Sequence, residues 1–191
     1  LCLVCNHRIA WNHKSVQLGL PEVTLGLLPG GGGVVRLTKL LGFEKAAPFL
    51  LEGKRVPPVQ ALDAGMIHEL VADPHNLVAK AKEWILASKD NADAAIQPYD
   101  QKGYKIPGGG ITSPKIVQAI TGATAMLTQK TRGLLPAPAK ILDVAAQALR
   151  LDLDTALMVE SRALAALTIT PQAKNMISTF FFGLNKVNGG A

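Results

Sequence analysis

The sequence predicts an α/β protein in which helix predominates, because apolar segments short enough for strands occur only in the first 71 residues. Residues 89–112 are polar and contain Pro98, Pro107 and the run Gly108–Gly110, which is typical of a loop or linker. Beyond them, prolines and capping residues introduce a series of alanine-rich helical patterns. We therefore divide the chain into residues 1–88, a linker over 89–112 and an all-helical segment over 113–191.

Three strands and four helices are expected in the first 88 residues, after the end of an earlier helix. Residues 1–9 resemble the end of a helix, and Gly42 separates two helical patterns. Pro57 and Pro58 suit the first turn of a third helix that ends near Gly65. Trp84 lies at helical spacing with other apolar residues, so we expect it to face the core. The expected ranges are strands over 8–10, 15–18 and 66–71, and helices over 34–41, 43–51, 57–65 and 76–87.

Four further helices are expected after the linker. Ser113 and Thr170 are each followed by proline, a combination that suits a cap and a first helical turn. Pro138 provides another start, and Asp152 or Asp154 provides a third capping residue. The expected helices end near residues 128, 149, 166 and 185.

The composition is typical of a globular protein, and the charge limits the classes of ligand that the chain is expected to bind. Of the 191 residues, 48% are hydrophobic and 18% charged, which suits a protein with a substantial core. The net charge of +6 favours a phosphorylated ligand. Nucleic acid is the competing interpretation, but the basic residues are dispersed, aromatic residues are scarce and no known reader motif occurs, so we expect no nucleic-acid partner.

The two cysteines indicate a reducing compartment rather than a disulfide framework. Cys2 and Cys5 have His7 and His13 nearby, which leaves zinc as an alternative. Because no second cysteine pair follows, we expect buried cysteines on a helix face and no metal. No apolar run reaches membrane-spanning length, so we expect no integral membrane segment. The apolar pattern is already under way at Leu1, and we expect a piece of a longer protein.

The segment over residues 20–33 contains the strongest functional signal. Glu22 is a lone acid in an uncharged run, and poor solvation there would raise a carboxyl pKa toward neutrality. Pro29 is followed by four glycines and a helical pattern, so backbone N–H groups are available to a ligand. Two alternatives remain open: the glycines form a turn that binds no ligand, and Glu22 caps a helix or forms a salt bridge. A phosphate loop is disfavoured because Val34, Val35 and Arg36 stand where its Lys-Ser/Thr ending would be. A dinucleotide-binding motif is disfavoured because no strand with a ribose-binding acid is apparent downstream.

Four blocks of sequence resemble known proteins. The first is Pro-Glu, a short apolar segment, Gly, two apolar residues and Pro-Gly-x-Gly-Gly, and it resembles the crotonase (enoyl-CoA hydratase/isomerase) superfamily. The second block is similar to another segment of the same family. The last two resemble multifunctional fatty-acid oxidation proteins, in which a hydratase is fused to a 3-hydroxyacyl-CoA dehydrogenase. The four blocks occupy residues 21–33, 51–67, 131–138 and 160–181.

The resemblance implies the C-terminal half of a ClpP/crotonase-like fold followed by helices, and an acyl-CoA thioester as substrate. By position, Glu22 matches one of two catalytic glutamates, and Gly30 matches the glycine whose N–H faces the reacting centre. Leu27, Pro29 and Gly31 fall in the same block and are expected to contact substrate. The other glutamate and both oxyanion donors would precede Leu1, so we expect the fragment alone to be inactive.

The implied activity is hydration of 2-trans-enoyl-CoA to 3-hydroxyacyl-CoA in fatty-acid β-oxidation. An enoyl-CoA isomerase of the same fold and a non-catalytic helical docking scaffold are the alternatives. No cofactor is expected in this fragment, with NAD serving a dehydrogenase domain outside it. The resemblance further implies a thiolase subunit as partner, an oligomer, and a cytoplasmic location in bacteria or the mitochondrial matrix in eukaryotes.

Overall fold

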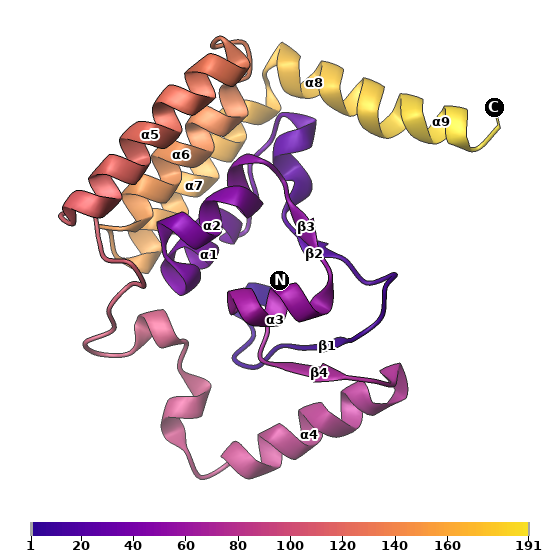
Figure 1. Ribbon diagram of the computed structural model, residues 1–191, viewed down its shortest axis with the longest axis vertical. Coiled ribbons are helices and arrows are strands. Elements are labelled where there is room, and N and C mark those ends of the chain that lie inside the picture. Colours follow the sequence, from indigo (N-terminus) through magenta and orange to yellow (C-terminus); the bar gives the residue numbers. More distant parts are fainter. Residues whose placement is uncertain (1, 191) are drawn as a thin grey trace.

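The computed structural model describes residues 2–190 and places a layer of helices beside a smaller strand-containing part (Figure 1). In sequence order, the elements before residue 89 are β1 (Ile9–Trp11), β2 (Leu18–Gly19), α1 (Gly33–Leu41), α2 (Phe43–Leu51), β3 (Arg55–Val56), α3 (Pro58–Ala64), β4 (Glu69–Val71) and α4 (Leu77–Ser88). The helices after residue 112 are α5 (Pro114–Thr131), α6 (Pro136–Ala148), α7 (Leu153–Thr168), α8 (Pro171–Ile177) and α9 (Leu184–Asn188). Helices therefore predominate, as the sequence predicts.

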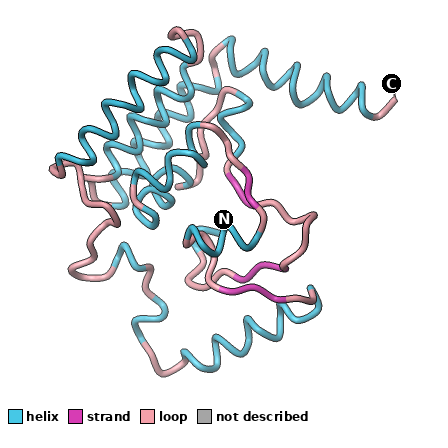
Figure 2. Tube along the Cα trace, in the orientation of Figure 1, coloured by secondary structure: helices cyan, strands magenta, loops and turns pink. Residues whose placement is uncertain are grey.

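The strands form two small sheets in the first part of the chain (Figure 2). β1 pairs with β4 in parallel, with Ala10 opposite Leu70. β2 pairs antiparallel with β3, with Leu18 opposite Val56. The strands expected over 8–10 and 15–18 are thus present with shifted limits, and each finds its partner more than 35 residues further along the chain.

The helical layer surrounds one apolar core. α6 packs against α1, α2, α5 and α7, and α1 also contacts α7. Figure 1 shows α5, α6 and α7 side by side with α1 and α2 beside them. Because the core includes side chains from both α1–α2 and α6, the segments before and after the linker fold against each other. Its members include Val34, Val35, Leu37, Phe43, Phe49, Leu50, Ile141, Leu142 and Val144.

Local sequence signals explain most helix ends. Gly42 has φ 76° between α1 and α2, where an added Cβ would collide with the carbonyl oxygen of Pro107. The Asp152 side chain accepts from the Thr155 N–H at the start of α7, and the Thr170 hydroxyl accepts from the Ala173 N–H at the start of α8. These caps act within four residues, so they can be read from sequence.

The linker contains only two 3-10 turns, Ala92–Ala95 and Pro98–Asp100, and two of its side chains donate hydrogen bonds to the part of the chain that precedes it. The Gln97 side-chain amide donates to the Val4 carbonyl at 2.7 Å. The Tyr104 hydroxyl donates to the Lys39 carbonyl at 2.9 Å. The segment is therefore held against the N-terminal turn, Cys2–Val4, and against α1.

Four expectations about elements are wrong in detail. Residues 2–4 form a 3-10 turn and not the end of a helix, and Cys2 and Cys5 are exposed instead of buried. α6 begins at Pro136, two residues before the expected Pro138, because either proline suits a first turn. Trp84 does not enter the core: its ring stacks on His7 with centroids 4.8 Å apart, and α4 has no buried residue.

The chain ends in an arm of continuous helix. α8 continues through a π-helical segment, Ser178–Gly183, into α9. Figure 1 shows this arm projecting away from the helical layer, and Phe180, Phe181 and Phe182 are exposed on it. In the part of the chain that the structure describes, no helix is both long and apolar enough to cross a membrane.

Candidate functional site

A pocket of about 350 Å³ brings Glu22 and the glycine run together. Glu22 comes from the 3-10 turn Pro21–Leu25, and Gly30–Gly33 lead into α1. Further walls come from the N-terminal turn, β2 and the segment before β4. The pocket is lined by Cys2, Leu3, Val4, Arg8, Gln17, Leu18, Gly19, Leu20, Glu22, Gly30, Gly31, Gly32, Gly33, Met66 and Ile67.

Glu22 presents an unused acceptor at this pocket. Its backbone carbonyl accepts from the Leu27 N–H at 3.1 Å, which fixes the turn. Its side-chain Oε2 is buried and has no hydrogen-bond partner among the described residues. A buried carboxylate oxygen without a partner is costly unless a ligand or water satisfies it. No salt bridge of the described residues involves Glu22, which argues against the salt-bridged alternative.

The glycine run has free and occupied N–H groups. Gly32 and Val35 donate to Glu160, and Val34 donates to the Pro29 carbonyl. In the described hydrogen bonds, none uses the N–H of Gly30 or Gly31, and both residues are exposed. The N–H of the buried Gly33 also has no partner among these bonds, so the exposed donors left for a ligand are those of Gly30 and Gly31 at the start of the run.

The residues that sequence reasoning selected fall into two groups. Glu22, Gly30 and Gly31 line the same pocket. Leu27 and Pro29 lie outside the lining: Leu27 packs on the hydrophobic core, and Pro29 is buried behind the run, where its Cβ lies 2.6 Å from the position of a Cβ added to Gly33. Their placement supports the backbone and not the pocket surface.

Glu160 is a functional candidate that the sequence did not reveal. It lies on α7, is 1% exposed, and accepts from Gly32 N at 2.5 Å and Val35 N at 3.0 Å. Burial raises the pKa of this carboxyl, opposed by hydrogen bonds from the backbone N–H groups of Val35, Gly32 and Val34 and by the charge of Arg36. A signal existed, since Glu160 shares a helix face with the buried Ala156 and Leu167.

Arg8 is the second residue that sequence reasoning missed. Its side chain lines the pocket, is buried, and has no carboxylate partner among the described residues. It donates from Nε to the Met66 carbonyl at 2.7 Å and from Nη1 to the Cys5 carbonyl at 2.6 Å. Burial lowers its pKa. Arg8 thereby ties the N-terminal turn to the segment before β4, and these two form one wall.

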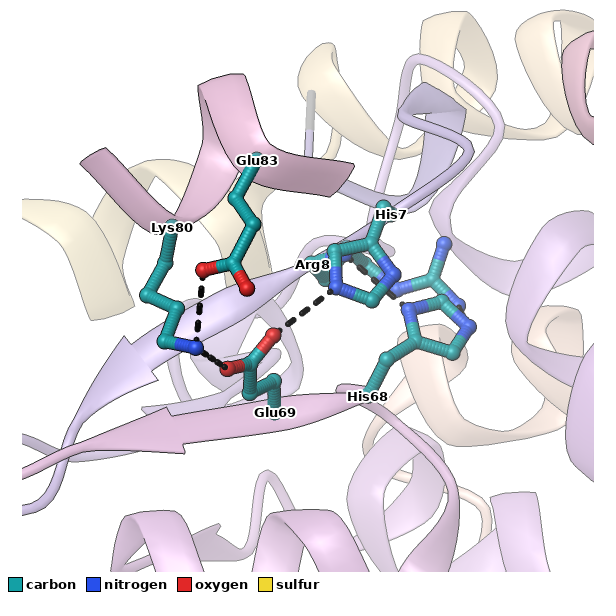
Figure 3. Close-up of polar contacts among 6 residues, drawn as sticks. All are labelled: His7, Arg8, His68, Glu69, Lys80 and Glu83. Carbon is teal, nitrogen blue, oxygen red and sulfur yellow. Dashed lines mark hydrogen bonds and ion pairs between the residues drawn. The ribbon is translucent and has the colours of Figure 1, made fainter. Parts of the chain in front are cut away.

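A polar cluster lies outside the pocket, between the β1–β4 sheet and α4 (Figure 3). Lys80 on α4 contacts Glu69 at 3.6 Å and Glu83 at 2.9 Å, and Glu69 contacts His7 at 3.5 Å. The rings of His7 and His68 are stacked with centroids 5.0 Å apart. This cluster joins α4 to the sheet.

His68 is held in its neutral form in this cluster. Its Nδ1 accepts from the Arg8 backbone N–H at 3.0 Å, so a proton on Nδ1 would break that bond. Partial burial of the ring, with the nearby charges of Arg8 and His7, lowers its pKa from 6.5 to about 4. The described residues contain no group of three or more His, Cys, Asp or Glu side chains suited to a metal.

The chain belongs to the enoyl-CoA hydratase/isomerase family, which it matches over residues 1–102. It is 35% identical over 181 residues to the fatty acid oxidation complex subunit alpha of Shewanella amazonensis, covering 95% of this chain and 25% of that protein. The corresponding subunit of Shewanella baltica is 34% identical over the same length. The chain thus spans about a quarter of the curated relatives it matches.

Solved structures agree on the fold. Carnitinyl-CoA hydratase from Mycobacterium avium superposes with a TM-score of 0.55 at 22% identity, covering 94% of this chain and 53% of that one. Enoyl-CoA hydratase/isomerase from Pseudoalteromonas atlantica gives a TM-score of 0.54 at 18% identity, covering 95% and 55%. The expected part of a crotonase fold is confirmed, together with the predominance of helix.

Proposed function

We propose that the whole protein hydrates 2-trans-enoyl-CoA to 3-hydroxyacyl-CoA, and that this chain supplies one side of the active site. One observation supports this most directly: Glu22 shares a pocket with Gly30 and Gly31, and among the described residues neither its buried Oε2 nor their N–H groups have a hydrogen-bond partner. An acid beside backbone donors suits a reaction that moves a proton next to a polarised carbonyl. The division of the chain by a linker over residues 89–112 belongs to the same proposal, in which Leu27 and Pro29 support the backbone behind the pocket.

In the proposed reaction, water adds across the double bond of the thioester. The water O–H bond breaks as its oxygen bonds to C3, the π electrons move to C2, and C2 takes a proton. Glu22 acts as one of two carboxylates that hold the water and transfer protons, with the second carboxylate outside this chain. The N–H of Gly30 faces the reacting centre. Donors to the thioester oxygen also lie outside this chain, and such donors contribute about 3–4 kcal/mol each.

The proposal extends to partners. The substrate is an acyl-CoA, this chain's site uses no cofactor, and NAD serves a 3-hydroxyacyl-CoA dehydrogenase elsewhere in the whole protein. The relatives' name, subunit alpha of a complex, supports a partner subunit, and we propose a thiolase in an oligomeric assembly. Because the relatives are bacterial proteins, we propose the cytoplasm, and for a eukaryotic protein we propose the mitochondrial matrix.

The test is Glu22→Gln in the full-length protein. Gln keeps the size of the side chain but cannot exchange the proton, so hydration of crotonyl-CoA is expected to fall about a hundredfold or more. Dehydrogenase activity on 3-hydroxybutyryl-CoA is the internal control and is expected to persist. A folded Glu22→Gln protein with a normal hydration rate would contradict the proposal.

A second substrate separates the alternatives. The wild-type full-length protein is assayed with a 3-enoyl-CoA alongside crotonyl-CoA. Double-bond migration that depends on Glu22, without hydration, would identify an isomerase instead. If the protein catalyses neither reaction, the docking scaffold remains as the function of this chain.

A further inference from the structure

We propose that Glu160 is a positioning residue, which holds the glycine run so that the N–H groups of Gly30 and Gly31 face the pocket. The inference rests on the proposed function of that pocket. It assigns a task at the site to α7, a helix whose first residue lies 120 positions after the first residue of α1.

The contact joins a buried acid to the start of a helix. Glu160 accepts one hydrogen bond with each carboxylate oxygen, Oε1 from Gly32 and Oε2 from Val35. The first N–H groups of a helix have no partner within the helix, and a negative charge there interacts favourably with its dipole. Two bonds to N–H groups three residues apart fix both the direction of α1 and the end of the glycine run.

Two more contacts hold the same run. Arg36 donates from Nη1 to the Gly31 carbonyl at 2.9 Å. A Cβ added to Gly30 would lie 2.5 Å from the Leu164 side chain, so Gly30 packs directly on α7. Glu160 and Leu164 are four residues apart and occupy one face of that helix. Contacts from α7 therefore flank the two exposed glycines, Gly30 and Gly31, whose N–H groups have no partner among the described residues.

This arrangement selects which donors reach a ligand. The Gly32 N–H is occupied by Glu160, and the Gly30 and Gly31 N–H groups remain available at the exposed end. Gly32 has φ 87°, and a Cβ there would overlap the Arg36 guanidinium, so the turn tolerates no side chain. If the carboxylate were lost, the backbone would be free to rotate and the two donors would shift from their positions.

The experiment compares Glu160→Gln with Asp152→Ala in the full-length protein. Gln keeps the length of the side chain, but its amide NH₂ replaces one acceptor and opposes one backbone N–H. Asp152→Ala removes a cap from the same helix α7, at a residue that does not line the pocket. It therefore controls for a general loss of helix stability.

For Glu160→Gln, kcat for hydration is expected to fall about tenfold to a hundredfold with KM changed far less, because small displacements act at the reacting centre. Amide exchange is expected to accelerate at Gly32 and Val35 while α6 stays protected. Asp152→Ala is expected to lower the Tm and keep kcat within about twofold of wild type. Normal kcat in Glu160→Gln would overturn the inference, as would an equal loss of kcat in Asp152→Ala.

Two further measurements keep the result decisive. If Glu160→Gln does not fold, Glu160→Asp keeps the charge on a shorter side chain, and its kcat is expected to fall with the protection of Gly32. Full activity in Glu160→Asp despite lost protection at Gly32 would overturn the inference. A normal rate in Glu22→Gln would overturn the proposed function, whereas amide exchange at Gly32 still reports whether Glu160 holds the run.

Discussion

The helical layer and helix α4 are held in place by different forces. In the helical layer, apolar side chains of α1, α2 and α6 are buried in a shared core. α4 has no buried residue and contacts the sheet through a tryptophan–histidine stack and exposed ion pairs. Burial of apolar area contributes far more free energy than exposed ion pairs do. Stability is therefore unequally distributed along this chain.

The pocket adjoins the helical layer. One wall is the glycine run, which Glu160 and α1 tie to the helical layer. Another part of the lining is formed by Arg8 and by Met66, which lies in the segment before β4 and belongs to the same buried core. Breaking the contacts of the helical layer and those of α4 separately tests the difference between them.

The largest effect is expected from Ile141→Ala in α6. Ile141 is 0% exposed, so the substitution leaves a cavity in the shared core and is expected to lower the free energy of unfolding by about 2–5 kcal/mol. Ile85→Ala in α4 is the matched control: its side chain is 58% exposed, and a change within about 0.5 kcal/mol is expected. Urea denaturation of both variants measures the difference, and equal losses would contradict the comparison.

A smaller effect is expected from acid on the β1–β4–α4 region. The folded-state pKa of His68 is lowered from 6.5 to about 4, so the unfolded chain binds more protons between these values. This contribution to stability is complete above about pH 6.5 and is lost as the pH falls through that window toward 4.

The variant that isolates His68 is His68→Asn, whose side-chain oxygen can replace Nδ1 as the acceptor for the Arg8 N–H. Its unfolding free energy is expected to decline less than wild type between those pH values, measured by denaturation at several pH values. The control is the same substitution at the exposed His75, which lies outside this cluster, and the pH profiles of the two variants are compared. Identical profiles for wild type and His68→Asn would refute the assignment.

The smallest effect is expected from the ion pairs of Lys80. Its partners Glu69 and Glu83 are partly exposed, and exposed pairs contribute little because water and salt screen them. Lys80→Met is expected to cause a slight destabilisation that disappears near about 1 M NaCl, where the Debye length is about 3 Å. A loss comparable with Ile141→Ala, or one that salt leaves unchanged, would show that α4 is bound more strongly than its contacts indicate.

The sequence by itself determined the helices and most of their limits. Gly42, Asp152 and Thr170 act through backbone conformation or hydrogen bonds to residues within four positions, so their effect is visible in the local sequence. Where two signals compete over a short distance, as with Pro136 and Pro138, the limit shifts by two residues. Glu22 and the glycine run also stand out locally, as an isolated acid and a donor-rich turn.

The tertiary structure alone decided which distant residues meet. The pairing of β1 with β4 and the contact of Arg8 with Met66 span about 60 residues, and that of Glu160 with Gly32 spans 128. No local propensity encodes such contacts, because they depend on how whole elements pack. An acid in an alanine-rich helix is usually solvated, and only the packing of α7 on α1 makes Glu160 a buried acceptor for the glycine run.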